Sequence, residues 1–377
     1  MATVIIRKVS RLILTASLSL VAAATLTAHP PWGIVVSSTG VVYFSDLETV
    51  WKIDRDGNMT VFRAGVSGHH VHELSIDGQD NIYGPLSVYD AATRKYLVGV
   101  WKMTPAGSET EIQRPVDSVM SGISIWRDTT GNMYSIEQNN NRKERTLLLK
   151  RTPDGGVSTL AGSAYGYVDG KGPAAKFSSV YAMTFGADGK IYLTDGTYVR
   201  RVTLDGEVTT VAKDLTARTS EDKPTLFGGD DKILAGLAAD PAGNVFVADA
   251  GNRRLLKIGK DGRIGVAYRL DPPYFPTGVF VTPKGDVYVL EFSYTPPGTT
   301  DKPRVRKISA DGHDTILASR GVTGKGVIIT RPRSYLQYRL QGLLDIVNTP
   351  ASYFVLLIGA GAISVTIVWW RRSRKGV

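Results

Sequence analysis

The sequence predicts an all-β protein, a six-bladed β-propeller built from four-stranded blades. A related unit recurs six times between Pro30 and about Arg320, at the spacing of about 40–50 residues that is typical of propeller blades. Its clearest copy, Phe177 to Val211, contains four short β-rich runs joined in pairs by the turns ADG and LDG. The 40 Gly and 18 Pro among 377 residues also suit many short strands and turns.

The N-terminus reads as an export signal over residues 1–28. A charged start, MATVIIRKVSR, precedes the apolar run LILTASLSLVAAATLTA and a small residue at Ala28, as in a secretory signal peptide. Leu26 fits the usual small-residue cleavage pattern poorly, so an uncleaved signal anchor is the alternative. Either segment predicts that the domain at 29–320 is exported.

Two sets of Gly-containing turns divide each repeat. The turns between the first and second strands read SSTGV, DGQDN, DTTGN, GADGK, DPAGN and TPKGD. Those between the third and fourth strands read DRDGN, TPAGS, TPDGG, TLDGE, GKDGR and SADGH. Gly supplies the positive φ that such turns need. Both sets lie on one face of a propeller, so the long connections gather on the opposite, loop-rich face, where functional residues are expected.

Two stretches resemble the NHL-repeat propellers. AGSAYGYVDGKGPAAKF (Ala161 to Phe177) is similar to the linker of that family, and NVFVADAGNRRLLKI (Asn244 to Ile258) is similar to its strand-and-turn core. The resemblance covers about 290 residues, with blades four and five matching best. It implies a six-bladed propeller related to the gluconolactonase and strictosidine synthase-like proteins. Because these relatives differ in activity, the resemblance does not settle function.

The C-terminus predicts a membrane anchor. Residues 321–350 read as a basic amphipathic juxtamembrane segment or a short linker helix, and residues 351–370 contain no charge. Twenty uncharged, mostly apolar residues suffice for one membrane span. The basic tail at 371–377 is then cytoplasmic by the positive-inside rule. We therefore expect a single-pass membrane protein with its propeller in the periplasm or outside the cell.

The net charge of +10 does not indicate a nucleic-acid partner. The segments 1–28, 331–350 and 371–377 carry +3, +2 and +4 of it, which leaves +1 for residues 29–330. Binding to nucleic acid phosphates needs a basic surface that this domain lacks. The absence of Cys excludes disulfides, thiol nucleophiles and Cys-ligated zinc.

One blade differs at the start of its innermost strand. Alignment of the six repeats brings five small residues and Glu73 to this position; the small ones are Gly33, Gly122, Ala182, Gly236 and Gly278. Glu73 ends the run GHHVHE, so the sequence predicts a ligand-binding group of His69, His70, His72 and Glu73 near the channel mouth. His and carboxylate are ordinary ligands of zinc and other divalent ions. Non-ligating, hydrogen-bonded His side chains are the alternative.

Acidic residues end the second strand in five blades, with Gly84 in the sixth. They are Asp46, Glu137, Asp195, Asp249 and Glu291. Asp before Gly or Asn is a common turn residue, which explains three of them. Glu137 and Glu291 precede long loops, so we include them in a candidate calcium or zinc site with His72 and Glu73. Tyr181 is a further candidate for lining the pocket, or it packs between blades.

A cation occupies one position of the third strand in every blade: Lys52, Lys102, Lys150, Arg201, Lys257 and Lys307. Because side chains alternate along a strand, these cations are expected to cover apolar surface with their stems.

Two functions remain open. The first is a binding module that holds a protein, glycan or small-molecule ligand through the loop-rich face. The alternative is a metal-dependent hydrolase or lactonase with its ion at the channel mouth, which requires several ligands to converge on one point. Motifs such as G-x-S-x-G or H-E-x-x-H, which would identify an enzyme, do not occur.

Overall fold

The computed structural model describes residues 31–93, 95–117, 125–138, 144–222, 234–293 and 303–319. These residues belong to one compact unit, His29–Ser293 with Asp301–Thr330. The predicted signal segment, juxtamembrane segment, membrane span and basic tail lie outside the described residues, as does Gly122. Within the described ranges, no helix is long and apolar enough to cross a membrane.

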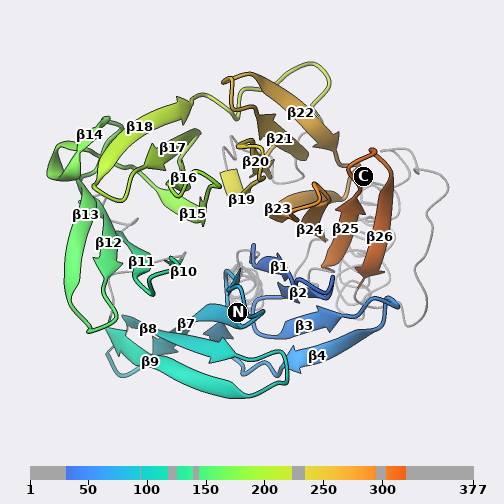
Figure 1. Ribbon diagram of the computed structural model, residues 1–377, viewed down its shortest axis with the longest axis horizontal. Coiled ribbons are helices and arrows are strands. Elements are labelled where there is room, and N and C mark those ends of the chain that lie inside the picture. Colours follow the sequence, from blue (N-terminus) through green and yellow to red (C-terminus); the bar gives the residue numbers. More distant parts are fainter. Residues whose placement is uncertain are drawn as a thin grey trace, which may run out of the picture. The chain divides into compact units, whose positions relative to one another are not determined.

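The fold confirms the prediction of six β-sheets, one for each repeat, arranged around a common centre (Figure 1). In blades 1 to 3 the strands are β1 (Ile34–Val36), β2 (Val42–Ser45), β3 (Val50–Ile53), β4 (Met59–Arg63), β5 (His69–His70), β6 (Ser75–Ile76), β7 (Ile82–Asp90), β8 (Lys95–Met103), β9 (Glu109–Asp117), β10 (Ile125–Arg127), β11 (Met133–Gln138), β12 (Arg145–Arg151) and β13 (Val157–Ala164).

In blades 4 to 6 they are β14 (Gly170–Lys171), β15 (Val180–Phe185), β16 (Ile191–Asp195), β17 (Tyr198–Val202), β18 (Glu207–Ala212), β19 (Leu234–Ala239), β20 (Val245–Asp249), β21 (Arg254–Ile258), β22 (Ile264–Arg269), β23 (Tyr274–Val281), β24 (Val287–Ser293), β25 (Arg304–Ile308) and β26 (Asp314–Ser319). A single 3₁₀ turn, Gly172–Ala174, follows β14.

Each blade uses strands that are consecutive in the sequence and antiparallel to their neighbours. Neighbouring innermost strands contact each other around the centre, in the order β10, β15, β19, β23, β1 and β6. The junction between β6 and β10 adjoins undescribed residues. The first and last blades meet where β1 contacts β23. The ring therefore closes without a strand shared between the two ends of the chain. Blade 4 carries an additional outer strand, β14, paired with β18.

The twelve predicted turns share one geometry. In each, the backbone N–H of the fourth residue donates to the carbonyl of the first at 2.8–3.1 Å. The fourth residue adopts a left-handed φ between 61° and 95°, and it is Gly in every turn except DGQDN, where it is Asp80. Gly adopts this conformation at little steric cost, so the recurring Gly of the sequence sets the length of each hairpin.

The hydrophobic core lies between adjacent blades. One buried cluster joins Val35 and Val50 of blade 1 to Ile82 and Trp101 of blade 2. Equivalent clusters join blades 3 and 4, blades 4 and 5, and blades 5 and 6. Each sheet thus buries both faces, which explains the continuous apolar runs of its second strands.

The six cations of the third strands face aromatic residues across the sheet. The register places each Lys or Arg opposite a Tyr or Phe of the second strand; the aromatic partners are Tyr43, Tyr83, Tyr134, Tyr192, Phe246 and Tyr288. The ammonium groups of Lys102, Lys257 and Lys307 lie 5.4–5.7 Å from their ring centroids. Cation–π contact of this kind stabilises the pairs, so the ladder is a feature of the fold.

Small residues at the innermost strands allow neighbouring backbones to meet. A Cβ atom added at Gly278 would lie 2.3 Å from the carbonyl oxygen of Trp32, where blade 6 meets blade 1. One at Gly236 would lie 2.8 Å from the carbonyl oxygen of Thr277, and one at Gly33 would lie 2.9 Å from the carbonyl carbon of Glu73. At these three positions only Gly fits without a shift of the backbone, because the sheets converge toward the centre.

We predict that Gly278→Ala weakens ring closure. The new methyl group would push β23 from Trp32, and overpacking of this kind lowers the free energy of unfolding by roughly 1–3 kcal/mol. Urea unfolding of the full-length chain, followed by circular dichroism, measures this. Gly265→Ala in β22 is the matched control, since nothing lies within 4 Å of its new Cβ atom. Equal stability of the two variants would contradict the prediction.

We also predict an acid-sensitive turn at Asp128. Partial burial would raise the pKa of this carboxyl, but hydrogen bonds from Asn132, Thr130 and Tyr134 outweigh it and lower the pKa to about 2. A lowered folded-state pKa gives stability that is present above the unfolded-state value of 3.8 and is lost as the pH falls from there toward 2. Because the carboxyl is partly exposed and solvent screens its interactions, Asp128→Asn should remove about 1 kcal/mol of that pH dependence. Urea titrations at pH 2 to 5 test this, and identical slopes for the two proteins would refute it.

Candidate functional site

Blade 2 departs from the other blades at its innermost position. Both β5 and β6 pair with β7, but the chain between them leaves the ladder. Pro85 of β7 lies opposite this gap, and proline has no N–H to donate to a neighbouring strand. His70 pairs with Ser87 whereas Ser75 pairs with Tyr83, so the inner segment has one residue too many for a regular ladder. The interruption releases residues 71–74 from blade 2.

The released segment pairs with blade 1 instead. Val71 donates its N–H to the carbonyl of Leu47 at 2.6 Å, and Trp32 donates its N–H to the carbonyl of His72 at 2.8 Å. The hydroxyl of Ser45 donates to the carbonyl of Val71 at 2.7 Å. His72 and Glu73 are therefore held at the junction of blades 1 and 2, where their exposed fractions are 4% and 5%.

An aromatic cluster surrounds this junction. The Trp32 indole stacks on the His72 imidazole with ring centroids 5.5 Å apart, and the Tyr181 ring meets the Trp32 edge at 6.4 Å. His70 lies at 5.7 Å from His72. Burial lowers the pKa of His70, which favours its neutral form near pH 7. The structure thus gathers His70, His72 and Tyr181 around Trp32, while His69 stands half-buried at the start of β5.

Beside Glu73 lies a cavity of about 240 Å³. The innermost segments of all six blades line it, each with at least one apolar side chain: Ile34, Ile76, Trp126, Phe185, Leu237 and Val279. Glu73 provides a carboxylate and Thr184 a hydroxyl. Trp32 and Trp126 also line the cavity, and their indole nitrogens are buried without a hydrogen-bond partner among the described residues. The site is apolar with few polar groups, as is common in ligand pockets.

Glu137 and Glu291 form ion pairs within their own blades. Glu137 of β11 pairs with Arg145 of β12. Glu291 is fully buried and pairs with Arg304 and Arg306 of β25, the latter at 2.6 Å. Neither carboxylate lines the cavity that Glu73 lines. The structure therefore does not bring together the set of Glu73, His72, Glu137 and Glu291.

The other acids at the ends of second strands are also paired. The Asp46 carboxylate accepts from the Trp51 indole at 2.8 Å. Asp249 of β20 accepts from the Arg254 guanidinium of β21 at 2.8 Å. Burial raises the pKa of Asp249, and the hydrogen bonds from Asn252 and Arg254 oppose that rise. In each of these five blades, the acidic residue at the end of the second strand thus binds a side chain of the third strand, which is a structural role.

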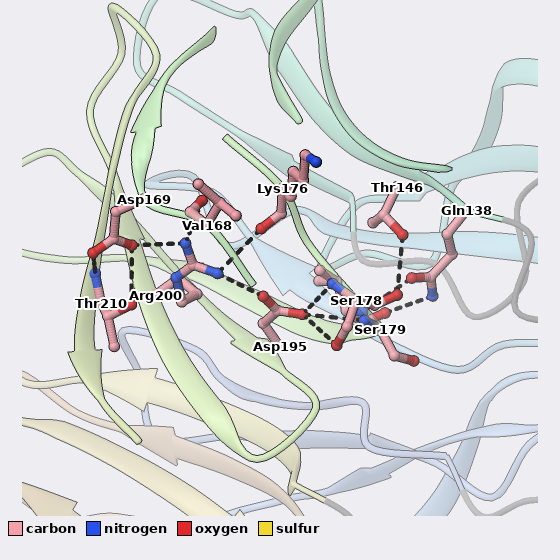
Figure 2. Close-up of polar contacts among 11 residues, drawn as sticks. Gln138, Thr146, Val168, Asp169, Lys176, Ser178, Ser179, Asp195, Arg200 and Thr210 are labelled. Carbon is pink, nitrogen blue, oxygen red and sulfur yellow. Dashed lines mark hydrogen bonds and ion pairs between the residues drawn. The ribbon is translucent and has the colours of Figure 1, made fainter. Parts of the chain in front are cut away.

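The pairing in blade 4 extends into a network that reaches blade 3 (Figure 2). Arg200 of β17 binds Asp195 at 2.8 Å and Asp169 at 2.7 Å. The Asp195 carboxylate accepts from the Ser178 N–H at 2.7 Å, and the Thr146 hydroxyl of blade 3 donates to the Ser178 carbonyl at 3.1 Å. Burial raises the pKa of Asp195, against the hydrogen bonds from Ser178 and the charge of Arg200.

No metal centre forms among the described residues, because no group of three or more His, Asp or Glu side chains there is placed to hold an ion. The donor set proposed from the sequence therefore does not fit a calcium or zinc ion in the arrangement that the structure gives. The ring contacts of His70 and His72 are compatible with non-ligating imidazoles, the alternative considered from the sequence, and the side-chain hydrogen bonds of that alternative stay a prediction.

Sequence reasoning missed the arginines and the cavity. A signal for the pairing was present, since Asp195 and Asp249 each stand five residues before the arginine that binds them, and Asp46 stands five before Trp51. Glu291 gave no such signal, because its partner Arg304 is thirteen residues away across a long loop. Trp32 and Trp126 carried no motif, since the cavity they line exists only when all six blades have closed.

Comparisons with known proteins support the fold. Neither a protein-family model nor a curated protein matches the chain. Among solved structures, a luciferin-regenerating enzyme matches with a TM-score of 0.51 and 15% identity over 81% of this chain and 98% of its own. A streptogramin B lyase has a TM-score of 0.47 and 17% identity, covering 80% and 86%. Regucalcin, a calcium-binding protein from Agrobacterium tumefaciens, has 0.46 and 15%, covering 69% and 81%.

These likenesses concern the six-bladed propeller, since identities this low say nothing of activity. The gluconolactonase-like resemblance of the sequence stays a prediction beyond the propeller fold. The NHL-repeat resemblance stays a prediction, as no family model matches.

We predict that Glu291 is a structural residue. Glu291→Gln would leave Arg304 buried without its counter-charge and Arg306 with Asp314 alone, and loss of a buried ion-pair partner lowers the free energy of unfolding by about 3–5 kcal/mol. Glu109→Gln is the control, because its carboxylate pairs with Arg63 at a site where Glu109 is 42% exposed, and such pairs contribute less than about 1 kcal/mol. Urea unfolding of the full chain compares the two. A fully stable Glu291→Gln protein would show that the residue is free for another role.

Proposed function

We propose that this chain is an exported, membrane-tethered propeller that binds a small ligand at the centre of its blades. The observation that carries the proposal is the cavity of about 240 Å³ lined by the innermost segments of all six blades. Ligand pockets commonly enclose about 300–1,000 Å³, so this volume suits a small molecule. A rigid ring of sheets supports the cavity on every side, which limits the entropy lost on binding.

The lining favours a ligand with an apolar body and one or two polar groups. Leu237 and Val279 offer apolar surface, and Phe185 adds an aromatic ring. Burial of such surface drives association at roughly 25 cal/mol per Å². The hydroxyl of Thr184 and the carboxylate of Glu73 then orient the polar groups of the ligand. The aromatic cluster around Trp32 supports a platform at the same junction.

A metal-dependent hydrolase is less well supported. Such an enzyme needs several ligands around one ion, and no such group occurs among the residues that the structure describes. Glu291, the buried carboxylate included in the predicted donor set, already binds two arginines. A glycan or a protein that engages the loop-rich face through the undescribed connections is compatible with the same binding role.

The location rests on the terminal sequences. The signal segment at 1–28 and the uncharged stretch at 351–370 both favour export of the propeller with one C-terminal anchor. The basic tail at 371–377 would then lie in the cytoplasm. These assignments are part of the proposal.

The cavity is tested with a neutral probe, 4-fluorobenzyl alcohol, by fluorine NMR of the full-length chain in lipid nanodiscs. The wild-type protein should broaden the probe signal. Ala239→Phe should abolish the broadening, because Ala239 lines the cavity and a benzyl group there fills it. Ala310→Phe is the control, since Ala310 is an exposed residue of a tight turn.

Equal broadening by wild type and Ala239→Phe would contradict binding in the cavity. Metal analysis of the same preparations separates the alternative: about one equivalent of calcium or zinc, lost in Glu73→Ala, would favour the hydrolase.

A further inference from the structure

The second and third strands of blade 2 project beyond the rim of the propeller. Strands β7 and β8 pair over nine positions, from Ile82 opposite Met103 to Asp90 opposite Lys95. Gly84 of blade 2 stands where the other blades have an acidic residue. In blades 1, 4 and 5 the second strand ends at that acidic residue or one residue before it. Six residues of β7 follow Gly84, and at about 3.3 Å per residue they extend the hairpin by up to about 20 Å.

Hydrogen bonds link the described residues near the tip of the projecting hairpin. The Asp90 carboxylate accepts from the N–H of Ala92 at 3.0 Å and from the hydroxyl of Thr93 at 2.7 Å. Strand β5 supports the hairpin on one side and β9 on the other, where Val116 pairs with Val98. The extension is therefore part of a sheet.

One face of this extension exposes aromatic and apolar side chains. Tyr89 and Tyr96 are directly opposite each other, their rings are 5.2 Å apart, and each is 50% exposed. Val116 is a third apolar residue and is 49% exposed. It pairs with Val98, which lies two positions from Tyr96 in β8, so Val116 is on the same face as the two tyrosines. An exposed aromatic pair on a rigid projection is a common sign of a binding surface.

The end of the propeller lies on the same side as the hairpin. The fourth strand of a blade runs from the tight turns back to the loop-rich face, so β26 ends at that face with Ser319. The predicted membrane span begins at residue 351, which leaves 31 residues between them. A linker of that length without regular structure would span about 30 Å on average. The chain therefore leaves the propeller toward the predicted anchor from the face that carries the hairpin.

We propose that the Tyr89–Tyr96 tip of blade 2 inserts into the headgroup layer of the membrane that carries the anchor. Tyrosine is enriched at membrane interfaces because its ring is apolar and its hydroxyl remains hydrated. A short tether keeps the effective concentration of lipid high, so the small apolar area of the tip suffices for contact. This inference rests on the membrane tether of the proposed function, but it does not depend on the cavity.

The experiment uses the absence of cysteine. Because the chain has no Cys, Ala92→Cys places one environment-sensitive nitrobenzoxadiazole label at the hairpin tip. Ala310→Cys places the same label in a tight turn on the opposite face, and both alanines are exposed. Each full-length variant is reconstituted into vesicles of phosphatidylcholine and phosphatidylglycerol, with or without 5-doxyl phosphatidylcholine as a lipid-borne quencher.

The label at residue 92 should be quenched at least about twofold more by the doxyl lipid than the label at residue 310, since interfacial groups lie within ~5–10 Å of the acyl boundary. Aqueous iodide should show the opposite preference. Adding Tyr89→Ser and Tyr96→Ser to the Ala92→Cys protein should remove the difference. These two side chains are half exposed, so the fold should tolerate their loss.

Equal doxyl quenching of both labels in protein that floats with the vesicles would overturn the inference and leave the tether intact. Protection of the residue 92 label from both quenchers would show that a protein surface covers the tip, and it would also overturn the inference. Failure of the chain to float with vesicles would refute the tether and the inference together, whereas the cavity test above is independent of all three results.

Discussion

The convergence of six sheets on one centre is the constraint on which the rest of this structure depends. Where the innermost strands meet, backbones approach so closely that a single Cβ atom at Gly278 would lie 2.3 Å from the carbonyl oxygen of Trp32. Small residues at this position let the ring close through non-covalent contact between β1 and β23. The central cavity exists because the same strands leave room beside these contacts. Ring closure and the candidate site are therefore consequences of one packing requirement.

Blade 2 shows how an exception to that requirement produces a site. Glu73 occupies a place that is small in the other blades. It is accommodated because Pro85 interrupts the ladder and lets the preceding residues 71–72 pair with blade 1. Gly84 belongs to the same change, since a Cβ atom there would lie 2.3 Å from the Trp101 ring. A proline and a glycine in one strand thus bring the Glu73 carboxylate to the cavity and the His72 imidazole against Trp32.

Much of the fold could be predicted from the sequence because its determinants are local. Eleven of the twelve turns follow from Gly at one position, and the register follows from alternation, as the pairing of Tyr83 with Lys102 illustrates. The candidate site was harder to predict, because the residues that form it are distant from one another in the sequence. Glu291 was considered a ligand because a long loop was predicted after it, and its arginine partners lie 13 and 15 residues away in the sequence. Trp126 and Glu73 line the same cavity only after the blades assemble.

The buried ion pairs also limit the interactions that the acidic residues near the loop-rich face can make with a ligand. Asp195, Asp249 and Glu291 are each compensated by an arginine within hydrogen-bond distance, so the ring of acids that the sequence displays has little charge left to attract a cation from outside. The groups that remain at the centre and on the blade 2 hairpin are mainly aromatic and aliphatic. Association at such surfaces is driven by apolar burial, which is weakly affected by salt. In the binding role proposed above, recognition at these two surfaces should therefore depend on the shape and apolar area of the ligand more than on charge.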